Sequence, residues 1–423
     1  MFLERLLHFS AATIVLLALS LLAVLLSVAE WPRIRYSPDI LLLCGMAAEL
    51  ILVAVAPPAG SLTIGPFGIR IYAIAVQLFC LGLAVLFVFP SLRRWWFPTL
   101  VVAHCCIGIW VVVVSRPVED VLIFQQQSAE ALMNGGNPYT LTFPDPYGAD
   151  SKYFYGNGLS VNGRLLFGYP YLPASLLFVL PGYFLGDVRF SHLAAVVLAA
   201  LVMFRMARDD TGKWAAGMFL FTPWVFHMEE IGWTEPFLVL MFAITVALRA
   251  GGSRLVPLVL ALFLALKQYT VLVLPLALQL LGPRPVGTAA FLAGAVTLPF
   301  AFWDLSAFLH SAVWLQFRQP WRSDVLSFAV LLNYFGLPRM PWLGFVAAAV
   351  ALIIVMRRRN AEPAVFARDV AFVLLAFFAF NKQAFYNYYF LVLGALCTAI
   401  AASGSGQRIA GPEVDRCNLD RDH

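Results

Sequence analysis

Long apolar segments separated by polar stretches make up most of the chain. Four apolar runs come first, at 9–29, 39–57, 70–90 and 98–115. A polar interval at 116–168 separates them from a denser series of runs at 170–186, 188–207, 214–226, 236–250, 255–266, 269–281, 286–302, 342–356, 364–380 and 387–403. Backbone in lipid must satisfy its own hydrogen bonds, so each run predicts a helix.

This pattern predicts an all-α, polytopic integral membrane protein of about 11–13 transmembrane helices. We expect an N-terminal four-helix membrane segment (1–115), a large extracytoplasmic loop with amphipathic, interfacial helices (116–187), a C-terminal membrane bundle (188–403) and a disordered cytoplasmic tail (404–423). Several later runs are shorter than the roughly 20 residues that a full span needs. Because such interrupted helices are tolerated where they line a cavity, the C-terminal bundle is predicted to enclose one.

Composition strengthens the membrane interpretation. Of the 423 residues, 61% are hydrophobic and only 12% are charged, whereas a soluble domain has about 25% charged residues. A soluble core could not hold this much apolar surface, so most of it must face lipid. Cytosolic enzymes, disordered proteins and secreted disulfide scaffolds are therefore excluded. The six cysteines lie mostly inside apolar runs and are interpreted as packing residues.

The net charge of +5 does not indicate a nucleic-acid partner. Lysines and arginines lie between apolar segments instead of along one face, which is typical of a positive-inside orientation signal. If the more basic loops face the cytoplasm, the interval 116–168 lies on the opposite side of the membrane.

The richest polar stretch runs from Ser115 to Tyr139. Pro117 suits the first turn of a helix and the Gly135–Gly136 pair ends it. Between them, one stripe recurs at helical spacing: Val121, Phe124, Ser128, Ala131 and Leu132. The pattern predicts an amphipathic helix at the membrane surface, with Glu119 and Asp120 in its first turn. Carboxylates at that position also stabilise a helix through its dipole, so a structural role is the alternative.

Lys267 lies in the middle of a long apolar stretch. A lysine at membrane depth is costly unless it meets an anion or a water-filled cavity, and a lipid-linked phosphate is the anion we expect. Snorkelling of the side chain to the interface is the structural alternative.

Two further clusters mix polar and aromatic residues at the ends of apolar runs. The segment 380–389 includes Asn381 and Lys382 among several tyrosines, for which an interfacial aromatic belt is the alternative explanation. The segment 227–235 is an acidic turn that an ordinary loop also explains, and its histidine and glutamates are weak candidates for a metal site. Three polar residues within the early spans are expected to form interhelical hydrogen bonds: Glu49, Gln77 and His104.

The order of these motifs resembles the GT-C class of polyprenyl-phosphate-dependent glycosyltransferases, in particular glycosyltransferase family 87 and the mannosyltransferase of GPI-anchor assembly. The matching pieces are Asp120 to Tyr139, Tyr169-Pro-Tyr-Leu172, Gly232-Trp-Thr-Glu235, Lys267-Gln-Tyr, and Phe380-Asn-Lys382 with Tyr386, Tyr388 and Tyr389. The chain departs from the family pattern in having four apolar segments before Asp120, and Glu119-Asp120 in place of Asp-x-Asp. The resemblance implies that Asp120 is the catalytic base, with Glu119 the second candidate.

The predicted function is therefore transfer of mannose, or a similar hexose or pentose, from a polyprenyl-phosphate donor to a hydroxyl of a lipid or glycan acceptor. The transfer would invert the anomeric configuration of the sugar. It would take place at the extracytoplasmic face of a bacterial inner membrane, where membrane lipids surround the protein. We expect the donor phosphate to contact Lys267, Arg189 and Lys382. Substrate-binding candidates are Tyr139, Tyr169, Trp233, Glu235, Asn381 and Tyr386.

The sequence is compatible with a divalent metal cofactor, Mg²⁺ or Mn²⁺, for this reaction, and does not require one. The alternative function is a transporter or flippase of a lipid-linked sugar, which would use the same phosphate-binding lysine without chemistry. Asp120 separates the two functions, because transport alone needs no acid–base carboxylate at the outer surface.

Overall fold

The computed structural model describes residues 11–29, isolated positions between 74 and 89, and residues 91–403 apart from 223–224 and 359–360. The predicted run at 39–57, most of the run at 70–90 and the predicted tail at 404–423 lie outside the described residues. Glu49 and Gln77 also lie outside them.

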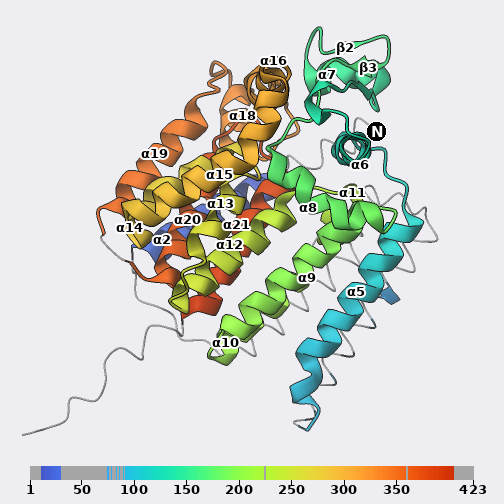
Figure 1. The fold of residues 1–423 in the computed structure, drawn as a ribbon. Helices are drawn as coiled ribbons and strands as arrows, with labels where there is room; N and C mark the ends of the chain where they lie inside the picture. The colour runs from blue at the N-terminus through green and yellow to red at the C-terminus, as the bar shows by residue number, and fades with distance from the viewer. Residues whose placement is uncertain are drawn as a thin grey trace, which may run out of the picture.

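The described chain is mostly helical, and its helices pack into an elongated bundle (Figure 1). The bundle comprises α2 (Ala11–Val28), α5 (Trp96–Val114), α9 (Arg189–Met206), α10 (Asp210–Leu220), α12 (Glu235–Ala250), α13 (Val256–Leu264), α14 (Leu274–Leu281), α15 (Pro283–Trp303), α19 (Leu343–Met356), α20 (Pro363–Ala379) and α21 (Tyr386–Ser403). Within it α20 packs along α21, α9 along α12, and α13 along α15. Apart from α10 and α14, their bounds lie within three residues of the predicted apolar runs.

Short elements connect the long helices. They are η2 (Arg93–Trp95), α8 (Pro173–Phe184), α11 (Val225–Ile231), the 3₁₀ turn η5 (Gln268–Val273), α16 (Leu305–Phe308), the π-helical turn η6 (Leu309–Trp314), α17 (Leu315–Arg318) and α18 (Phe328–Tyr334). The predicted run at 214–226 is thus divided between α10 and α11, and the run at 269–281 begins as a 3₁₀ turn.

Four described helices are long and apolar enough to cross a membrane: α5, α9, α15 and α21. The pair α11 and α12, bent by 118° at the break between them, adds a fifth candidate if it is one span. Large apolar side chains on these helices face outward, as Phe291 and Phe302 of α15 do with 75% and 76% of their surface exposed. Several apolar helices are therefore long enough to span a membrane, and their outer faces suit lipid.

The polar interval folds over one end of the bundle (Figure 1). It contains α6 (Asp120–Met133), η3 (Pro138–Thr140), η4 (Gly148–Asp150) and α7 (Ser151–Tyr155). It also contains a small antiparallel sheet in the order β1 (Phe143–Pro144), β3 (Arg164–Leu165), β2 (Ser160–Val161), in which Leu165 is opposite both Phe143 and Ser160. The sheet was not predicted, because two-residue strands leave no alternating pattern to detect. The described chain is otherwise helical, as predicted.

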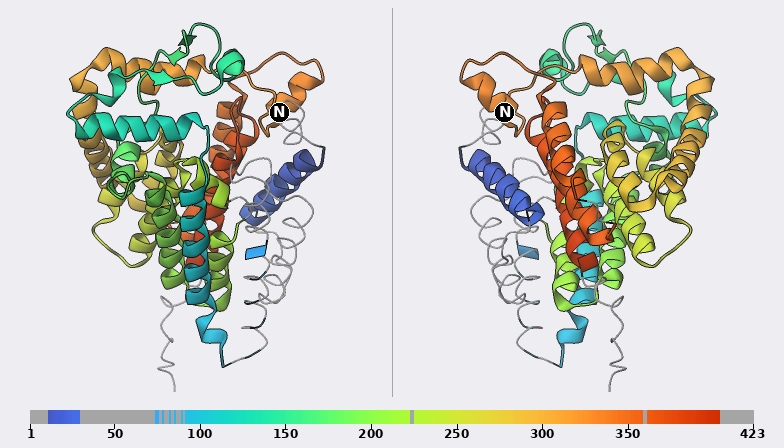
Figure 2. Two further views of the ribbon diagram at one scale, coloured as in Figure 1. Left: turned by 90° about the vertical axis from the view of Figure 1, so that its right-hand side faces the viewer. Right: turned by 90° about the vertical axis from the view of Figure 1, so that its left-hand side faces the viewer.

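The predicted amphipathic helix is α6, which lies across the bundle axis (Figure 2). The chain is extended at Glu119, becomes helical at Asp120, and leaves the helix at Asn134, where Gly135 takes a left-handed φ of +76°. Its buried face includes Val121, Phe124 and Ser128, three of the five positions in the predicted stripe. This placement holds Asp120 at the edge of the bundle.

Candidate active site

Asp120 begins α6 and is held by tyrosines of the covering loop. The Tyr155 hydroxyl donates a hydrogen bond to Asp120 Oδ2 at 2.7 Å, and the Tyr147 hydroxyl donates one to Glu119 Oε2 at 3.3 Å. The Asp120 side chain is partly exposed. Burial raises the pKa of the Asp120 carboxyl above its ordinary value, although the Tyr155 hydrogen bond favours the charged form. A carboxylate with a raised pKa that reaches solvent is suited to accept a proton.

Lys267 lies where the chain passes from α13 into η5, and its backbone there is extended, with φ −145° and ψ 152°. Its ammonium nitrogen is 2.6 Å from Glu235 Oε1, and the Tyr269 hydroxyl donates to the same oxygen at 3.1 Å. Both charged side chains are buried. The anion that Lys267 meets at depth is therefore a carboxylate of the protein itself, which the sequence analysis did not foresee.

Aromatic rings surround this ion pair. The Lys267 nitrogen lies 4.9 Å from the ring centre of Tyr171, 5.6 Å from that of Tyr388 and 5.8 Å from that of Tyr269. Such distances allow cation–π attraction, which helps to stabilise a buried ammonium group. The second oxygen of Glu235, Oε2, is buried without a hydrogen-bond partner in the described part of the chain.

Arg322 is a cation that the sequence analysis did not select. It is paired with Asp324, with Nε donating to Oδ1 at 2.9 Å and Nη2 donating to Oδ2. Its guanidinium lies 4.3 Å from the ring centre of Phe385 and 4.5 Å from that of Phe154. Burial alone would lower the pKa of Arg322, but the ion pair with Asp324 outweighs it and raises the pKa. Arg322 is therefore charged, and it is near enough to Asp120 to favour the ionised carboxylate.

Five side chains form a closed sequence of electrostatic neighbours, here called the polar ring: Asp120, Tyr171, Glu235, Tyr388 and Arg322. Burial raises the pKa of Tyr171, and the charges of Asp120 and Glu235 on either side add to the effect. Tyr388 is close enough to Glu235 and Arg322 to feel the charges of both. Arg322 is likewise close enough to act on the charge of Asp120. Among the described residues, the hydroxyls of Tyr171 and Tyr388 have no hydrogen-bond partner, and both side chains are partly exposed.

The ring combines segments that are far apart in the sequence. Asp120 comes from α6, Tyr171 from the turn before α8, Glu235 from the first turn of α12, Arg322 from the stretch after α17 and Tyr388 from α21. Of the predicted site residues, the structure brings together Asp120, Lys267 and Glu235. The one signal for Arg322 was the mixture of Gln, Trp, Arg and Asp at 319–324, next to an apolar segment.

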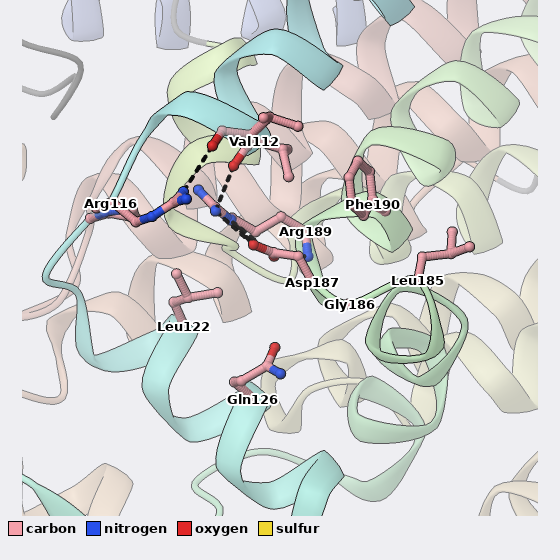
Figure 3. A pocket seen from close by; sticks show the side chains of 11 residues that line it. Val112, Arg116, Leu122, Gln126, Leu185, Gly186, Asp187, Arg189 and Phe190 are labelled. Carbon is pink, nitrogen blue, oxygen red and sulfur yellow. Dashed lines mark hydrogen bonds and ion pairs between the residues drawn. The ribbon is translucent and has the colours of Figure 1, made fainter.

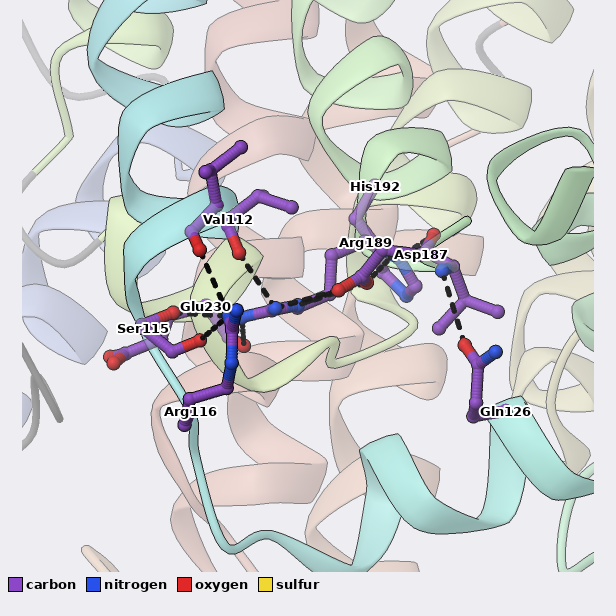
Figure 4. Close-up of polar contacts among 10 residues, drawn as sticks. Val112, Ser115, Arg116, Gln126, Asp187, Arg189, His192 and Glu230 are labelled. Atoms are coloured by element: carbon purple, nitrogen blue, oxygen red, sulfur yellow. Dashed lines mark hydrogen bonds and ion pairs between the residues drawn. The ribbon is translucent and has the colours of Figure 1, made fainter. Parts of the chain in front are cut away.

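Arg189 is used elsewhere in the molecule (Figure 4). It forms an ion pair with Asp187, with Nη2 2.6 Å from Oδ2, and it donates to Ser115 Oγ at 2.7 Å and to the Val112 carbonyl at 2.7 Å. A further bond to the Glu230 carbonyl at 3.2 Å completes the use of every N–H in the guanidinium. Arg189 therefore joins α5, α9 and α11, and its predicted contact with donor phosphate gains no support from this geometry.

Lys382 lies in the loop before α21, beside the stretch that carries Arg322. Its nitrogen donates to the carbonyls of Phe317 at 3.0 Å and Gln319 at 2.8 Å, and burial lowers its pKa. Within the described residues, Lys382 pairs with no carboxylate. Asn381 accepts a hydrogen bond from the Gln383 backbone, and Tyr386 begins α21.

The other predicted substrate contacts are mostly structural in this conformation. Tyr139 and Tyr169 are buried, and their hydroxyls bond the Tyr171 carbonyl at 2.9 Å and the Ser175 hydroxyl oxygen at 2.8 Å. The Trp233 ring lies 5.8 Å from the His227 ring, centre to centre. Their roles in sugar binding remain predictions.

The candidate metal residues of the acidic turn point to different partners. His227 contacts Glu230 at 3.4 Å, whereas Glu229 contacts His104 of α5 at 2.8 Å. In the parts of the chain that the structure describes, no three His, Cys, Asp or Glu side chains form a metal-binding group. The interhelical hydrogen bond predicted for His104 is confirmed, with Glu229 as its partner.

Comparison with known proteins adds no relative to this description. No family model, curated protein or solved structure matches the chain. The fold and the ring define a helical protein with apolar, membrane-length helices and a polar site where the loop 116–168 meets the bundle. Its function must be argued from that site.

Proposed function

We propose that the protein is a polyprenyl-phosphate-dependent glycosyltransferase of the GT-C type, with about 11–13 membrane helices in a bacterial inner membrane. The polar ring would face the periplasm or the outside. The sugar, mannose or a similar hexose or pentose, would pass to a hydroxyl of a lipid or glycan acceptor. The single observation that carries this proposal is the position of Asp120, a carboxylate grouped with Arg322 and tyrosines at the end of an apolar bundle.

In the proposed reaction, Asp120 accepts the proton of the acceptor hydroxyl as that oxygen forms a bond to C1 of the sugar. The bond between C1 and the phosphate oxygen breaks, and its electron pair leaves on polyprenyl phosphate. Attack opposite the leaving group inverts the anomeric configuration. The partly exposed hydroxyls of Tyr171 and Tyr388 are suited to bond the hydroxyls of the sugar.

Stabilisation of the leaving phosphate needs a nearby positive charge. Arg322 can supply this charge, because its pair with Asp324 uses Nε and Nη2, and its Nη1 forms no hydrogen bond with the described residues. Lys382 pairs with no carboxylate in the same part of the chain and supplies net positive charge. The ammonium group of Lys267 is 2.6 Å from Glu235. Lys267 therefore keeps its predicted role only if its ammonium group can contact the donor phosphate and Glu235 at the same time.

A direct test compares Asp120→Asn with the matched control Asp150→Asn. Asp150 is exposed on the same loop and lies outside the polar ring. The purified protein would be given a panel of polyprenyl-phosphate hexoses and pentoses with a membrane lipid extract, and release of polyprenyl phosphate would be measured. Asp120→Asn should lower turnover by roughly 10²–10⁴-fold with donor binding retained, whereas Asp150→Asn should retain turnover.

The same preparations separate the enzyme from a transporter. Wild-type protein that moves a fluorescent lipid-linked sugar across proteoliposomes, but releases no polyprenyl phosphate with any donor, would replace the glycosyltransferase proposal with the transporter alternative. Full turnover by Asp120→Asn would transfer the base role to Glu119 or Glu235.

A further inference from the structure

The helical segment 305–318, which comprises α16, η6 and α17, has an exposed apolar face. This apolar face consists of Leu305, Leu309, Trp314 and Phe317, which expose between 37% and 66% of their surfaces. The segment lies across the bundle at the end that also carries α6 (Figure 1, Figure 2). It contains no residue of the polar ring, so the proposed function does not account for this face.

A π-helical turn keeps the apolar face continuous. Leu309 and Trp314 are the first and last residues of η6. In an α-helix, residues five positions apart are separated by about 1.4 turns and point in different directions, whereas a π turn bonds such residues and keeps them on one side. The face therefore extends past the turn to Phe317, whose ring centre lies 6.4 Å from that of Trp314.

The opposite side of the segment is polar and is bound to the protein. The Gln316 amide donates to the Pro170 carbonyl at 2.9 Å, and the Gln268 amide donates to a backbone carbonyl of η6 at 2.6 Å. Pro170 precedes Tyr171, and Gln268 follows Lys267. The segment is therefore amphipathic, with its polar side fixed to the neighbours of two residues of the candidate site.

The segment begins directly after the candidate span α15. Asp304 ends α15 with an extended backbone, and its carboxylate accepts a hydrogen bond from the Ala307 N–H at 2.9 Å. A carboxylate in this position caps a new helix, so the chain changes direction at the end of the span. The exposed apolar positions of α15 continue through Phe302 and Trp303 to Leu305.

The end of the candidate span α5 shows a similar continuation. A groove of about 670 Å³ lies there, and its lining includes the exposed Val113 of α5 and the exposed Leu185 (Figure 3). Both spans end beside the polar interval, because α6 belongs to that interval and α16 contacts its turn η3. Apolar surface therefore extends past both spans at this end of the bundle, where a bilayer boundary would lie.

From these observations we propose that the segment 305–318 is an interfacial helix whose apolar face is inserted among the lipids of the adjacent leaflet. Exposed apolar patches mark contacts with a membrane or with another protein. Continuity with the outer face of α15 favours the membrane, and so does the tryptophan at each end of the corner, Trp303 and Trp314, because tryptophan is enriched at membrane boundaries.

The inserted segment holds the candidate site at the membrane surface, because its polar side is bound next to Tyr171 and Lys267. The proposal rests on the candidate spans lying in a bilayer and not on glycosyltransferase activity. A transporter with the same fold would have the same interfacial helix.

The test measures the depth of the apolar face. The full chain, in a background without native cysteines, carries Trp314→Cys or Phe317→Cys labelled with the fluorescent dye NBD and is reconstituted in nanodiscs. Emission is compared between ordinary phosphatidylcholine and phosphatidylcholine brominated near the headgroup end of its acyl chains, and then with iodide in the water. An interfacial helix lies about 5–10 Å into the boundary between headgroups and acyl chains. Both labels should therefore lose most of their emission to bromine and little to iodide.

Two exposed positions serve as matched controls. Phe291→Cys on α15 should be quenched by bromine, and Asp150→Cys on the polar loop should be quenched by iodide. Absence of bromine quenching at Phe291→Cys would show that α15 lies outside the bilayer and would overturn the proposal.

Quenching of the Trp314→Cys and Phe317→Cys labels by iodide alone would place the apolar face in water and overturn the proposal. Emission that resists both quenchers would show that another protein or a second copy of the chain covers the face, which overturns it as well. If one of the two variants fails to fold, the other decides. Because no turnover is measured, either result is independent of the outcome for Asp120→Asn.

Discussion

The Tyr155 hydroxyl donates a 2.7 Å hydrogen bond to Asp120 and so favours the charged form of the carboxylate. Burial raises the pKa of Asp120 and this bond opposes the rise, so loss of the hydroxyl should raise that pKa further. A general base works in its ionised form, which means that activity falls as pH drops through its pKa. Tyr155→Phe should therefore move the acidic limb of the rate profile to higher pH and leave the maximal rate at high pH largely intact.

The measurement is turnover against pH for Tyr155→Phe, wild type and Tyr183→Phe. Tyr183 is a partly buried tyrosine of α8 outside the polar ring, so its variant should match wild type. If the acidic limb of the rate profile lies at the same pH in Tyr155→Phe and wild type, then either Asp120 is not the base or Tyr155 does not affect its pKa.

The buried pair of Lys267 and Glu235 gives a prediction about stability. Removing one partner leaves the other charge buried and uncompensated, which costs about 3–5 kcal/mol, whereas apolar replacement of both partners is often nearly neutral. Lys267→Met and Glu235→Leu should each lower the free energy of unfolding by about that amount, and the double variant should recover most of it. Thermal and chemical unfolding in detergent measure this, with Arg254→Met as the exposed control.

Donor binding by the stable double variant then tests the phosphate role of Lys267. If the double variant retains its affinity for polyprenyl phosphate, Lys267 is a structural residue, and Arg322 and Lys382 are the candidates for binding the phosphate. Additive losses of stability in the double variant would contradict the pairing itself.

At the residue scale, the sequence indicated which charged residues would be costly to bury. It did not indicate the ion-pair and hydrogen-bond partners that offset this cost. Asp120, Lys267 and Glu235 were selected because of position and motif, and all three meet around Tyr171. Arg322 and Tyr155 were missed because the contacts that define them join segments 35 to 202 residues from Asp120, as the sequence positions show. No local pattern encodes such a distance.

At the scale of elements, Gln125 fixes the orientation of α6. Its buried amide donates to the Gly232 carbonyl at 2.5 Å and so ties α6 to the turn between α11 and α12. Gln125→Leu would leave that carbonyl unpaired, at a cost of about 1–3 kcal/mol. We expect faster hydrogen exchange in α6 and reduced turnover, whereas Gln127→Leu, on a partly exposed face of the same helix, should retain wild-type exchange. Wild-type exchange in Gln125→Leu would show that packing alone holds α6.

Element positions were largely predictable because long apolar runs and Pro–Gly punctuation are local signals. The bounds of α6, α9 and α21 lie within three residues of their predicted starts or runs. The division of 214–226 into α10 and α11, and the 3₁₀ turn after Lys267, were not predicted. The 3₁₀ turn begins directly after Lys267, whose buried charge needs Glu235 of another helix as its partner, and this is tertiary information.

At the scale of the molecule, basic residues lie at both ends of the bundle. Lys152 of α7 and Arg164 of β3 belong to the polar loop, and other arginines lie at the opposite end. Arg94 precedes α5, Arg205 is in the last turn of α9 and Arg249 is in the last turn of α12. Figure 1 shows α6, α7 and the sheet at the other end. The orientation with the polar ring outside the cytoplasm therefore stays a prediction from the positive-inside rule.

Cysteine labelling tests this orientation. The outer probe belongs at the exposed Asp150 and the inner probe at the exposed Arg254, each in a background without native cysteines. In intact cells, Asp150→Cys should react with an impermeant maleimide and Arg254→Cys should react only after permeabilisation, because a charged reagent does not cross the hydrocarbon layer. Both cysteines must label in permeabilised cells for the comparison to count. Labelling of Arg254→Cys alone in intact cells would reverse the topology and place the polar ring, with Asp120, in the cytoplasm, where a donor facing the outside could not reach it.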